Sequence, residues 1–303
     1  MRLTFLIFTL TFMNSYLVTG AVGQLGQCFQ TVAKEFPEIN LFFTSRNELD
    51  ITRSETLENL FSKNPFDGII NCAAYTVVDQ AEKEEESAFK INSEALQNLI
   101  AFVEEKKLSI IHFSTDYVFD GNSSEPYQEE AETNPLGVYG ASKLQGEIRL
   151  LKTSCKNVSI IRTSWLFSPF GKNFVKTIAH LAKEKKELKV VEDQRGRPTY
   201  GIDLVRAVLS LISNKTIYRF PILHYANKGI CSWKEFAEAI VNTSGSETKV
   251  LGVSSSDYPT LAKRPKYSIL DTERIERELK IEIPLWNESL KKCLQILKSN
   301  ESL

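Results

Sequence analysis

The chain alternates short apolar segments with longer segments of helical periodicity, and this alternation constrains its fold more than any other feature. Apolar segments predict strands over residues 16–18, 40–44, 68–71, 109–114 and 158–162. Helical patterns lie between them near residues 28–36, 54–62 and 87–106, and another begins at Tyr139. Strands joined by helices of this length lie parallel in one sheet, because right-handed crossovers place the helices over both of its faces.

We therefore predict an α/β fold with a Rossmann-like, doubly wound parallel sheet. A helix near residues 173–183 and the stretch 188–198 follow, and beyond them the regular alternation is lost. Helices are still predicted there, but loops that contain Pro and Gly separate them; they lie near residues 202–212, 232–243 and 271–279. We interpret residues 13–165 as the main domain, to which later segments return, and residues 166–303 mainly as a smaller C-terminal α/β lobe over the carboxyl edge of the sheet.

The composition excludes several classes of partner. Lys and Arg number 37 against 38 Asp and Glu, so no overall basic field attracts a nucleic acid polymer or an anionic membrane. The five cysteines are odd in number, scattered, and form no Cys-x-x-Cys, which argues against a disulfide framework and a zinc site. The three histidines lie too far apart for a local ligand pattern. We expect a cytoplasmic protein with no tight structural metal.

The N-terminus reads MRLTFLIFTLTFM, an apolar run like the central region of a signal peptide. It is too short to cross a bilayer as a helix. Cleavage after it would have to spare the first predicted strand, which begins immediately at Asn14. We therefore interpret residues 1–12 as an over-extended reading frame with Met13 as the natural start, and a secretory signal is the alternative.

A glycine turn, Gly20-x-x-Gly23-x-x-Gly26, lies between the first strand and the first helix. Backbone N–H groups at such a helix N-terminus bind the pyrophosphate of a dinucleotide, and glycines let the phosphates approach closely. We predict that Gly20, Gly23, Gln24, Leu25 and Gly26 bind a nicotinamide cofactor. A purely structural glycine turn is the alternative reading. Residues 13–165 then form an NAD(P)-binding domain, and residues 166–303 mainly a substrate-binding lobe.

In dinucleotide-binding folds, the residues at the end of the second strand contact the adenosine ribose and indicate the cofactor preference. An acidic residue there accepts a hydrogen bond from the 2′-hydroxyl, whereas an arginine accommodates a 2′-phosphate. The sequence there is Phe43-Thr44-Ser45-Arg46, without a carboxylate. Ser45 and Arg46 favour NADPH over NADH, although NADH stays open and Arg46 is also compatible with a plain surface residue.

Five further positions are predicted to line the cofactor. Asp50 and Ile51 are expected near the adenine. Ala73, Ala74 and Tyr75 follow the strand at residues 68–71, and the two small residues leave room for the cofactor to pass over the backbone.

Tyr139 and Lys143 lie four residues apart at the start of a predicted helix, so their side chains share one face. A nearby lysine cation favours the phenolate, and we expect Lys143 to lower the pKa of Tyr139 into a working range. Lys143 also reaches the ribose of the nicotinamide in this reading. Taken alone, the pair is more typical of an ordinary helix surface than of a catalytic site.

Thr115 and Asp116 follow the strand at residues 109–114, at the edge of the sheet where α/β proteins bind ligands. Thr115 is predicted to donate a hydrogen bond to a substrate carbonyl, beside the proton donor Tyr139. A strand-end cap is the alternative role for both residues.

The glycine turn combined with Tyr139-x-x-x-Lys143 resembles the extended branch of the short-chain dehydrogenase/reductase superfamily. Further segments extend the likeness; they are residues 71–82, 114–121, 139–143, 162–165 and 193–199, and Arg264-Pro265. Together with residues 19–26 they resemble the dTDP-4-dehydrorhamnose reductase family over nearly the whole chain from Met13.

This resemblance implies reduction of the C4 keto group of dTDP-4-dehydro-L-rhamnose by NAD(P)H, the last step in making dTDP-L-rhamnose for cell-surface polysaccharide. By matching motif, Tyr139 is the proton donor, Lys143 its partner, and Thr115 and Asp116 contact the sugar. Trp165 packs on the substrate, although a core role is equally ordinary. Arg264 neutralises the dTDP pyrophosphate, with a surface arginine as the alternative.

Two other functions stay open. The superfamily motifs alone permit another sugar-nucleotide reductase or an epimerase. Relatives that serve as the noncatalytic beta subunit of methionine adenosyltransferase keep the fold, and retention of Thr115, Tyr139 and Lys143 argues against that role. Some family members bind Mg²⁺ at a dimer contact; the sequence leaves both Mg²⁺ and a homodimer open.

Overall fold

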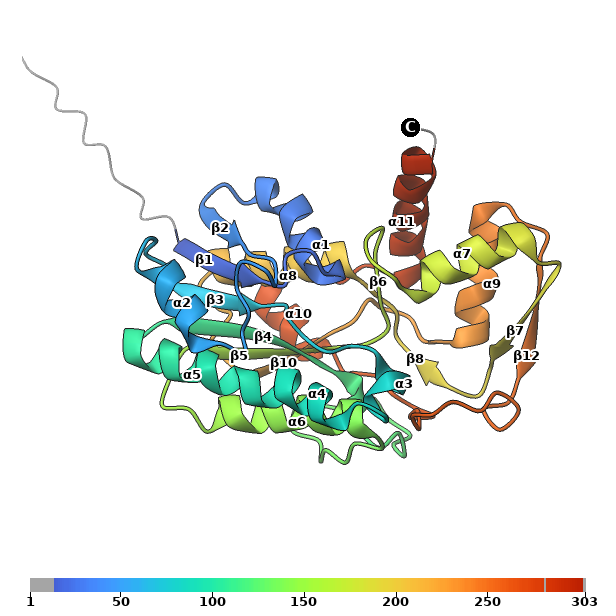
Figure 1. Cartoon of the computed structure of the whole chain (residues 1–303). Coiled ribbons are helices and arrows are strands. Elements are labelled where there is room, and N and C mark those ends of the chain that lie inside the picture. Colours follow the sequence, from blue (N-terminus) through green and yellow to red (C-terminus); the bar gives the residue numbers. More distant parts are fainter. Residues whose placement is uncertain (1–13, 281, 302–303) are drawn as a thin grey trace, which may run out of the picture.

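The computed structural model describes residues 14–280 and 282–301, and within them a six-stranded sheet lies between two layers of helices (Figure 1). The strand order is β10-β5-β4-β3-β1-β2, and every neighbouring pair is parallel. The strands are β1 (Asn14–Thr19), β2 (Ile39–Phe43), β3 (Gly68–Asn71), β4 (Ser109–Thr115), β5 (Val158–Thr163) and β10 (Ile222–Tyr225). The predicted doubly wound fold is confirmed. The predicted start at Met13 lies outside the described residues.

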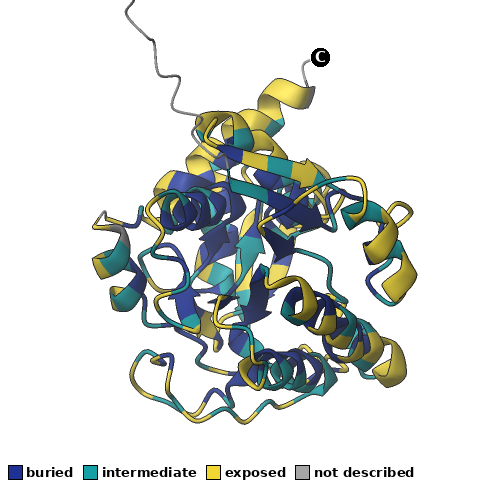
Figure 2. Ribbon diagram, turned by 90° about the vertical axis from the view of Figure 1, so that its left-hand side faces the viewer, coloured by how far each residue is buried: buried dark blue, intermediate teal, exposed yellow. Residues whose placement is uncertain are grey.

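The two faces of the sheet bury separate sets of side chains, because successive residues of a strand point to opposite sides. Tyr16 and Val18 of β1 belong to one apolar core, whereas Leu17 belongs to the other. Ile110 and Ile111 of β4 divide in the same way. The central strands are buried on both faces (Figure 2), as expected for a covered parallel sheet.

Helices α1 (Gln24–Val32) and α8 (Gly201–Ser213) pack together over one face. The other face is covered by α2 (Ser54–Phe61), α4 (Glu85–Phe89), α5 (Ala95–Lys106) and α6 (Val138–Leu151) (Figure 1). Helix α8 was expected in the smaller lobe, and so was α10 (Glu273–Leu279), which packs against β10. Both helices instead cover the main sheet, because β10 returns the chain to its edge.

The helix predicted over residues 87–106 is interrupted. Residues Lys90–Glu94 form a π-helical turn between α4 and α5. Such turns are frequent at functional sites, since they re-aim the side chains that they carry.

The smaller lobe contains α7 (Phe174–Glu184), α9 (Trp233–Ser244) and two strand pairs. Strand β7 (Glu187–Val191) pairs in parallel with β12 (Lys249–Val253), and β8 (Arg195–Gly196) pairs antiparallel with β11 (Cys231–Ser232). Short strands β6 (Leu166–Phe167) and β9 (Thr199–Tyr200) join the lobe to the sheet layer, and α11 (Trp286–Glu301) follows α10. Among the described helices, none has the length and apolar character needed to span a membrane.

Candidate active site

The glycine turn takes the conformation that only glycine adopts easily. Gly20 has φ of +66°, and an added Cβ there would lie 2.9 Å from the backbone of Cys72 and Ala73. An added Cβ at Gly26 would collide with the Gly20 carbonyl. Gly23 is the N-cap of α1, and no side chain caps this helix. The backbone thus leaves a close-packed turn at an uncapped helix N-terminus, which fits a pyrophosphate.

Gln24 and Leu25, which were also predicted to bind the cofactor, have different surroundings. Leu25, in the first turn of α1, is buried and belongs to the core. The Gln24 side chain accepts a hydrogen bond from Asn173 Nδ2 at 3.0 Å, which ties the turn to the start of α7. Of these two, only Gln24 faces the region between the sheet and the smaller lobe.

The end of β2 holds a carboxylate that the sequence analysis missed. Glu48 accepts hydrogen bonds from the backbone N–H and the hydroxyl of Ser45, at 2.8 and 2.7 Å. The turn after β2 folds Glu48 back onto Ser45, whereas Arg46 is exposed. Asp50 accepts from Thr52, and Ile51 is buried in the core.

The π-helical turn fixes the segment that follows β3. Asn92 accepts from the Tyr75 N–H at 2.8 Å and donates to the Tyr75 carbonyl at 3.0 Å. Its Nδ2 also donates to Ser142 of α6 at 3.0 Å. Ala73, Ala74 and Tyr75 are therefore held between the glycine turn and the helix that carries Tyr139.

Tyr139 lies in the first turn of α6, whose N-terminus is anchored by Glu82 through the Val138 N–H at 2.9 Å. The Tyr117 ring packs edge-on against Tyr139, with centroids 5.7 Å apart. Burial raises the pKa of Tyr139 to about 12, and a hydrogen bond with Thr115 opposes this only in part. Tyr139 therefore stays a neutral acid at physiological pH.

The expectation that Lys143 lowers the pKa of Tyr139 is wrong for this structure. Lys143 is buried, and its Nζ donates to the Phe113 carbonyl at 2.6 Å and lies 3.1 Å from His112 Nε2. Burial lowers the pKa of Lys143 to about 8, against the opposing influence of Glu147. The helix does bring both side chains to one face, but the buried ammonium is aimed at β4 rather than at the phenol.

Asp116 lies beside Thr115 and is buried. Its Oδ1 accepts from the Thr115 hydroxyl at 3.1 Å, and the Ser268 hydroxyl also interacts with this carboxyl group, but no described residue lies in hydrogen-bond geometry to its Oδ2. Burial raises the pKa of Asp116 to about 6. A buried carboxylate oxygen without a donor is costly, and a ligand hydroxyl would satisfy it.

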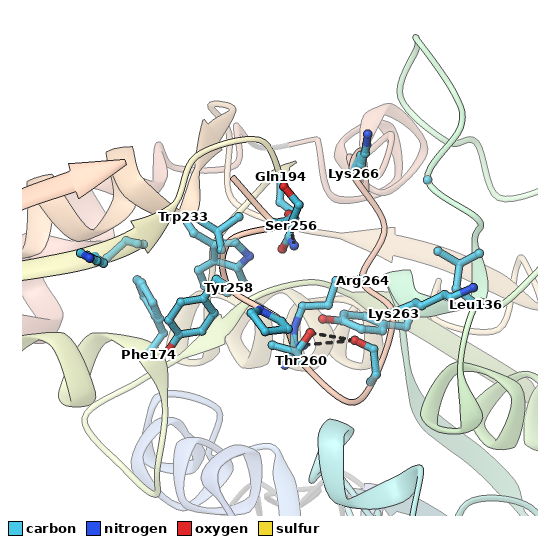
Figure 3. Close-up of a pocket in the computed structure, with 18 of the residues that line it drawn as sticks. Leu136, Phe174, Gln194, Trp233, Ser256, Tyr258, Thr260, Lys263, Arg264 and Lys266 are labelled. Carbon is cyan, nitrogen blue, oxygen red and sulfur yellow. Dashed lines mark hydrogen bonds between the residues drawn. The ribbon is translucent and has the colours of Figure 1, made fainter. Parts of the chain in front are cut away.

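A cavity of about 920 Å³ opens between the sheet layer and the smaller lobe (Figure 3). Trp233, Phe174 and Tyr258 gather at one end, and Arg264 and Lys263 lie toward the other. The lining reaches Tyr117 but does not include Tyr139 or Thr115. The edge-on contact of Tyr117 with Tyr139 thus connects the cavity to the predicted catalytic residues.

Arg264 lines this cavity, but its guanidinium is engaged. It donates to both carboxylate oxygens of Asp79, at 2.6 and 3.2 Å, and Ala262 N–H donates to the same carboxylate. This contact ties the C-terminal loop to the helical turn α3 (Val78–Ala81) of the main domain.

Trp165 does not line the cavity. It has φ of +46°, and its indole stacks on Trp233, with centroids 3.6 Å apart and planes 10° apart. Sequence reasoning missed Trp233, Phe174 and Tyr258, because single aromatic residues at helix starts and in loops are typical of any core. The signal for Trp233 was its place directly after the capping residue Ser232, which fixes it in the first turn of α9.

The family model for the RmlD substrate binding domain matches residues 13–299. The chain is 40% identical to the spore coat polysaccharide biosynthesis protein SpsK of Bacillus subtilis, over 93% of this chain and 98% of that protein. It is also 40% identical to the dTDP-4-dehydrorhamnose reductase of Aggregatibacter actinomycetemcomitans, over 92% of this chain and 98% of the relative.

Among solved structures, the dTDP-4-dehydrorhamnose reductase of Bacillus anthracis in complex with NADP superposes with a TM-score of 0.86. It shares 36% identity and covers 93% of this chain and 99% of its own. The match extends over both the sheet layer and the smaller lobe. The chain belongs to the dTDP-4-dehydrorhamnose reductase family, which carries the RmlD substrate binding domain.

Proposed function

We propose that the chain reduces the C4 keto group of dTDP-4-dehydro-L-rhamnose to give dTDP-L-rhamnose, with a reduced nicotinamide cofactor. The observation that carries this proposal is the contact of Tyr139 and Thr115 with Tyr117, which lines the cavity, in a chain whose family match spans residues 13–299. The product serves cell-surface polysaccharide synthesis.

The cofactor is assigned to the carboxyl edge of the sheet. The turn at Gly20, Gly23 and Gly26 would hold its pyrophosphate at the N-terminus of α1, and Ala73 and Ala74 would lie under it. When bound, the reduced nicotinamide supplies the hydride. NADPH is the proposed form, supported by Arg46 and by the NADP found in the Bacillus anthracis relative. Glu48 on Ser45 opposes a 2′-phosphate, so NADH is the second candidate.

The proton comes from the chain itself. As C4 gains hydrogen and the carbonyl bond becomes a single bond, the oxygen takes the proton from Tyr139 Oη. A neutral phenol suits this role, because its proton is present at every physiological pH. Thr115 orients the carbonyl, and the resulting tyrosinate regains its proton from water. Lys143 is assigned to the cofactor ribose and to stabilising the transient tyrosinate.

The cavity would accept the nucleotide. Aromatic rings suit a flat base, and cations suit a diphosphate, so Trp233, Phe174 and Tyr258 are proposed for the base and Arg264 for the phosphates. Asp116 Oδ2 is proposed to accept a sugar hydroxyl. Trp165 then acts through Trp233, which it supports from behind.

The test is coupled oxidation of NADPH with enzymatically generated dTDP-4-dehydro-L-rhamnose, followed by identification of the product sugar. Turnover to dTDP-L-rhamnose is expected. Its absence, together with tight binding to a methionine adenosyltransferase catalytic subunit, would favour the regulatory-subunit role. Adding Mg²⁺ or a chelator to the same assay tests metal dependence. A homodimer and a cytoplasmic location stay predictions.

A further inference from the structure

Asp79 of α3 accepts hydrogen bonds from the cavity loop, residues 254–264, which follows β12 and lines the cavity. Its Oδ1 accepts from the Ala262 N–H at 3.1 Å and from Arg264 Nη1 at 3.2 Å. Its Oδ2 accepts from Arg264 Nη2 at 2.6 Å. The Arg264 guanidinium, together with the Ala262 and Leu261 N–H groups, holds the pKa of Asp79 below its usual range. Asp79 is therefore an anion at neutral pH and forms a bidentate ion pair with Arg264.

This ion pair uses only one edge of the Arg264 guanidinium. Nη1 and Nη2 together form the end edge, which faces the carboxylate of Asp79. Nη1 also donates to the Ala262 carbonyl at 3.3 Å. Because a guanidinium carries five N–H groups in a planar fork, the second Nη2 hydrogen and the Nε hydrogen remain. These two hydrogens are parallel along the side edge, an arrangement that binds a phosphate through two hydrogen bonds.

Tyr117 also lies beside this guanidinium. Its hydroxyl interacts with Arg264, and burial raises the pKa of Tyr117, so the phenol is neutral. A charged phosphate oxygen is a stronger acceptor than a phenol oxygen and can take its place. The cavity lining includes Tyr117 and Arg264 but not Asp79. Asp79 thus contacts Arg264 without itself facing a ligand in the cavity.

The segments that carry the two residues are fixed by other contacts as well. Asp79 belongs to α3, and Glu82, directly after α3, accepts from the N-terminal N–H of α6 at 2.9 Å. In the chain after Arg264, Pro265 packs against Gly121, where an added Cβ would lie 2.5 Å from the proline ring. Loss of the ion pair is therefore expected to reorient the Arg264 side chain rather than to release the cavity loop.

Other cations line the cavity, but they differ from Arg264 in geometry. Lys263 and Lys266 add positive charge to the same cavity (Figure 3). A lysine ammonium is a point charge without a planar fork, so it attracts a diphosphate without fixing its orientation. Arg264 also has the suitable place, because Tyr117 contacts both Arg264 and the proton donor Tyr139. A phosphate held by Arg264 would be one ring away from Tyr139, at a distance that a sugar can span.

We propose that Asp79 is a positioning residue that holds the end edge of Arg264 and thereby aims its side edge at the diphosphate of the sugar nucleotide. The ligand is taken from the proposed function, on which this inference rests. Asp79 acts only through Arg264 and does not touch the ligand. The opposite role, in which Asp79 merely neutralises Arg264 and weakens anion binding, predicts effects of the opposite sign.

The test is equilibrium binding of dTDP and of thymidine to the intact protein without cofactor. Asp79→Asn keeps Oδ1 for the loop N–H groups but replaces Oδ2 by an amide NH₂ that opposes Nη2. It is expected to raise the Kd of dTDP about tenfold, the order of one charge-assisted hydrogen bond, and to leave the Kd of thymidine unchanged. Tighter dTDP binding would indicate neutralisation, and equal losses for both ligands would indicate a structural anchor. Either result overturns the proposal.

A double-mutant cycle with Arg264→Met shows whether Asp79 acts through Arg264. Arg264→Met alone is expected to weaken dTDP binding, and Asp79→Asn should cause no further loss in that background. An equal loss in both backgrounds would overturn the proposal. Glu86→Gln is the matched control, because it removes an exposed negative charge at the start of α4 that has no described contact with the cavity loop. It should change neither Kd.

A measurement on the wild-type protein decides the question if a variant does not fold. With ¹⁵N-labelled arginine, the Nε–H resonance of Arg264, assigned with Arg264→Lys, is expected to shift when dTDP binds and to stay in place with thymidine. A resonance that does not move at saturating dTDP would overturn the proposal. None of these measurements uses cofactor or turnover. If dTDP binding depends on Asp79 as expected but no reduction occurs, only the proposed function fails.

Discussion

Trp165 and Trp233 stack face to face at 3.6 Å, one at the end of β5 and the other in the first turn of α9. The positive φ of Trp165 and the close approach of its indole to Gly196 hold it in place. Only Trp233 reaches the cavity. The pair therefore works as a wall of two layers, in which one indole faces the ligand and the other fixes its plane.

Replacing Trp233, the indole that faces the cavity, should weaken binding of the sugar nucleotide. Trp233→Ala is expected to raise its KM by about tenfold, the order of one aromatic contact, while NADPH affinity stays near that of the wild type. Steady-state kinetics together with a cofactor titration provide the check. Trp165→Phe, which keeps an aromatic layer behind Trp233, serves as the milder comparison. Equal KM values for Trp233→Ala and the wild type would remove Trp233 from the substrate site.

Removing the phenolic proton should slow the reduction itself. Tyr139→Phe is expected to lower kcat by about a hundredfold or more, since general acid catalysis supplies that much, with cofactor affinity nearly intact. Single-turnover rates and NADPH binding, measured on the same preparation, separate the two effects. An unchanged rate would rule out Tyr139 as the proton donor.

The carboxylate at the end of β2 should influence the choice of cofactor. Glu48→Gln removes a negative charge beside Ser45 without shortening the side chain, and it is expected to raise the NADPH to NADH affinity ratio by about fivefold, the order of one exposed charge pair. Binding titrations with both cofactors at low and high salt measure this ratio. The gain should shrink at high salt because the site is exposed. Glu58→Gln on the nearby surface of α2 is the control.

The stability of the chain should depend on the ionisation of Asp116. Its pKa is raised by burial to about 6, so the native state binds this proton more tightly than the unfolded chain does. The stabilisation that results is complete below about pH 4 and is lost as the pH rises through about 6. Asp116→Asn cannot lose a proton and should escape this loss.

Relative to the wild type, the free energy of unfolding of Asp116→Asn is expected to gain up to about 3 kcal/mol between pH 4 and pH 7.5. Urea unfolding at the two pH values measures the change. Asp120→Asn, at a half-buried carboxylate whose pKa is lowered by the Asn122 N–H, should show the opposite trend. A constant difference between Asp116→Asn and the wild type would mean that Asp116 ionises normally.

Much of the sheet could be predicted from local pattern. The strand over residues 68–71 was found at its observed bounds, because a short apolar run between turn residues has few other uses. The return of β10 to the sheet edge was not located, since its four residues are too few to carry a periodic signal and their partner β5 is distant in sequence. Helix α8 was assigned to the wrong part of the molecule, because its apolar face predicts burial but does not identify α1 as its partner.

In the candidate site, the shared helix face of Tyr139 and Lys143 could be predicted from the sequence, but the electrostatics around them could not. Spacing brought Tyr139 and Lys143 to one face, as the helix requires. The direction of the Lys143 ammonium depends on His112 and on the Phe113 carbonyl, which a helix pattern does not reveal. Glu48 was missed because the turn after β2, rather than the strand end itself, returns the carboxylate to Ser45.

The π-helical turn at Lys90–Glu94 sets the rotation of α5 about its axis relative to α4. The contacts of the site, rather than regular α-helical geometry, determine this rotation. Each residue of an α-helix advances by about 100°, so deleting one residue there would restore a regular ladder but rotate one flanking segment against the other. Asn92 would then leave Tyr75 and Ser142. Such a deletion would make the helix more regular, but we expect it to destabilise the fold more than the local helix energetics indicate. The irregular turn determines which side chains of α4 and α5 face the neighbouring elements.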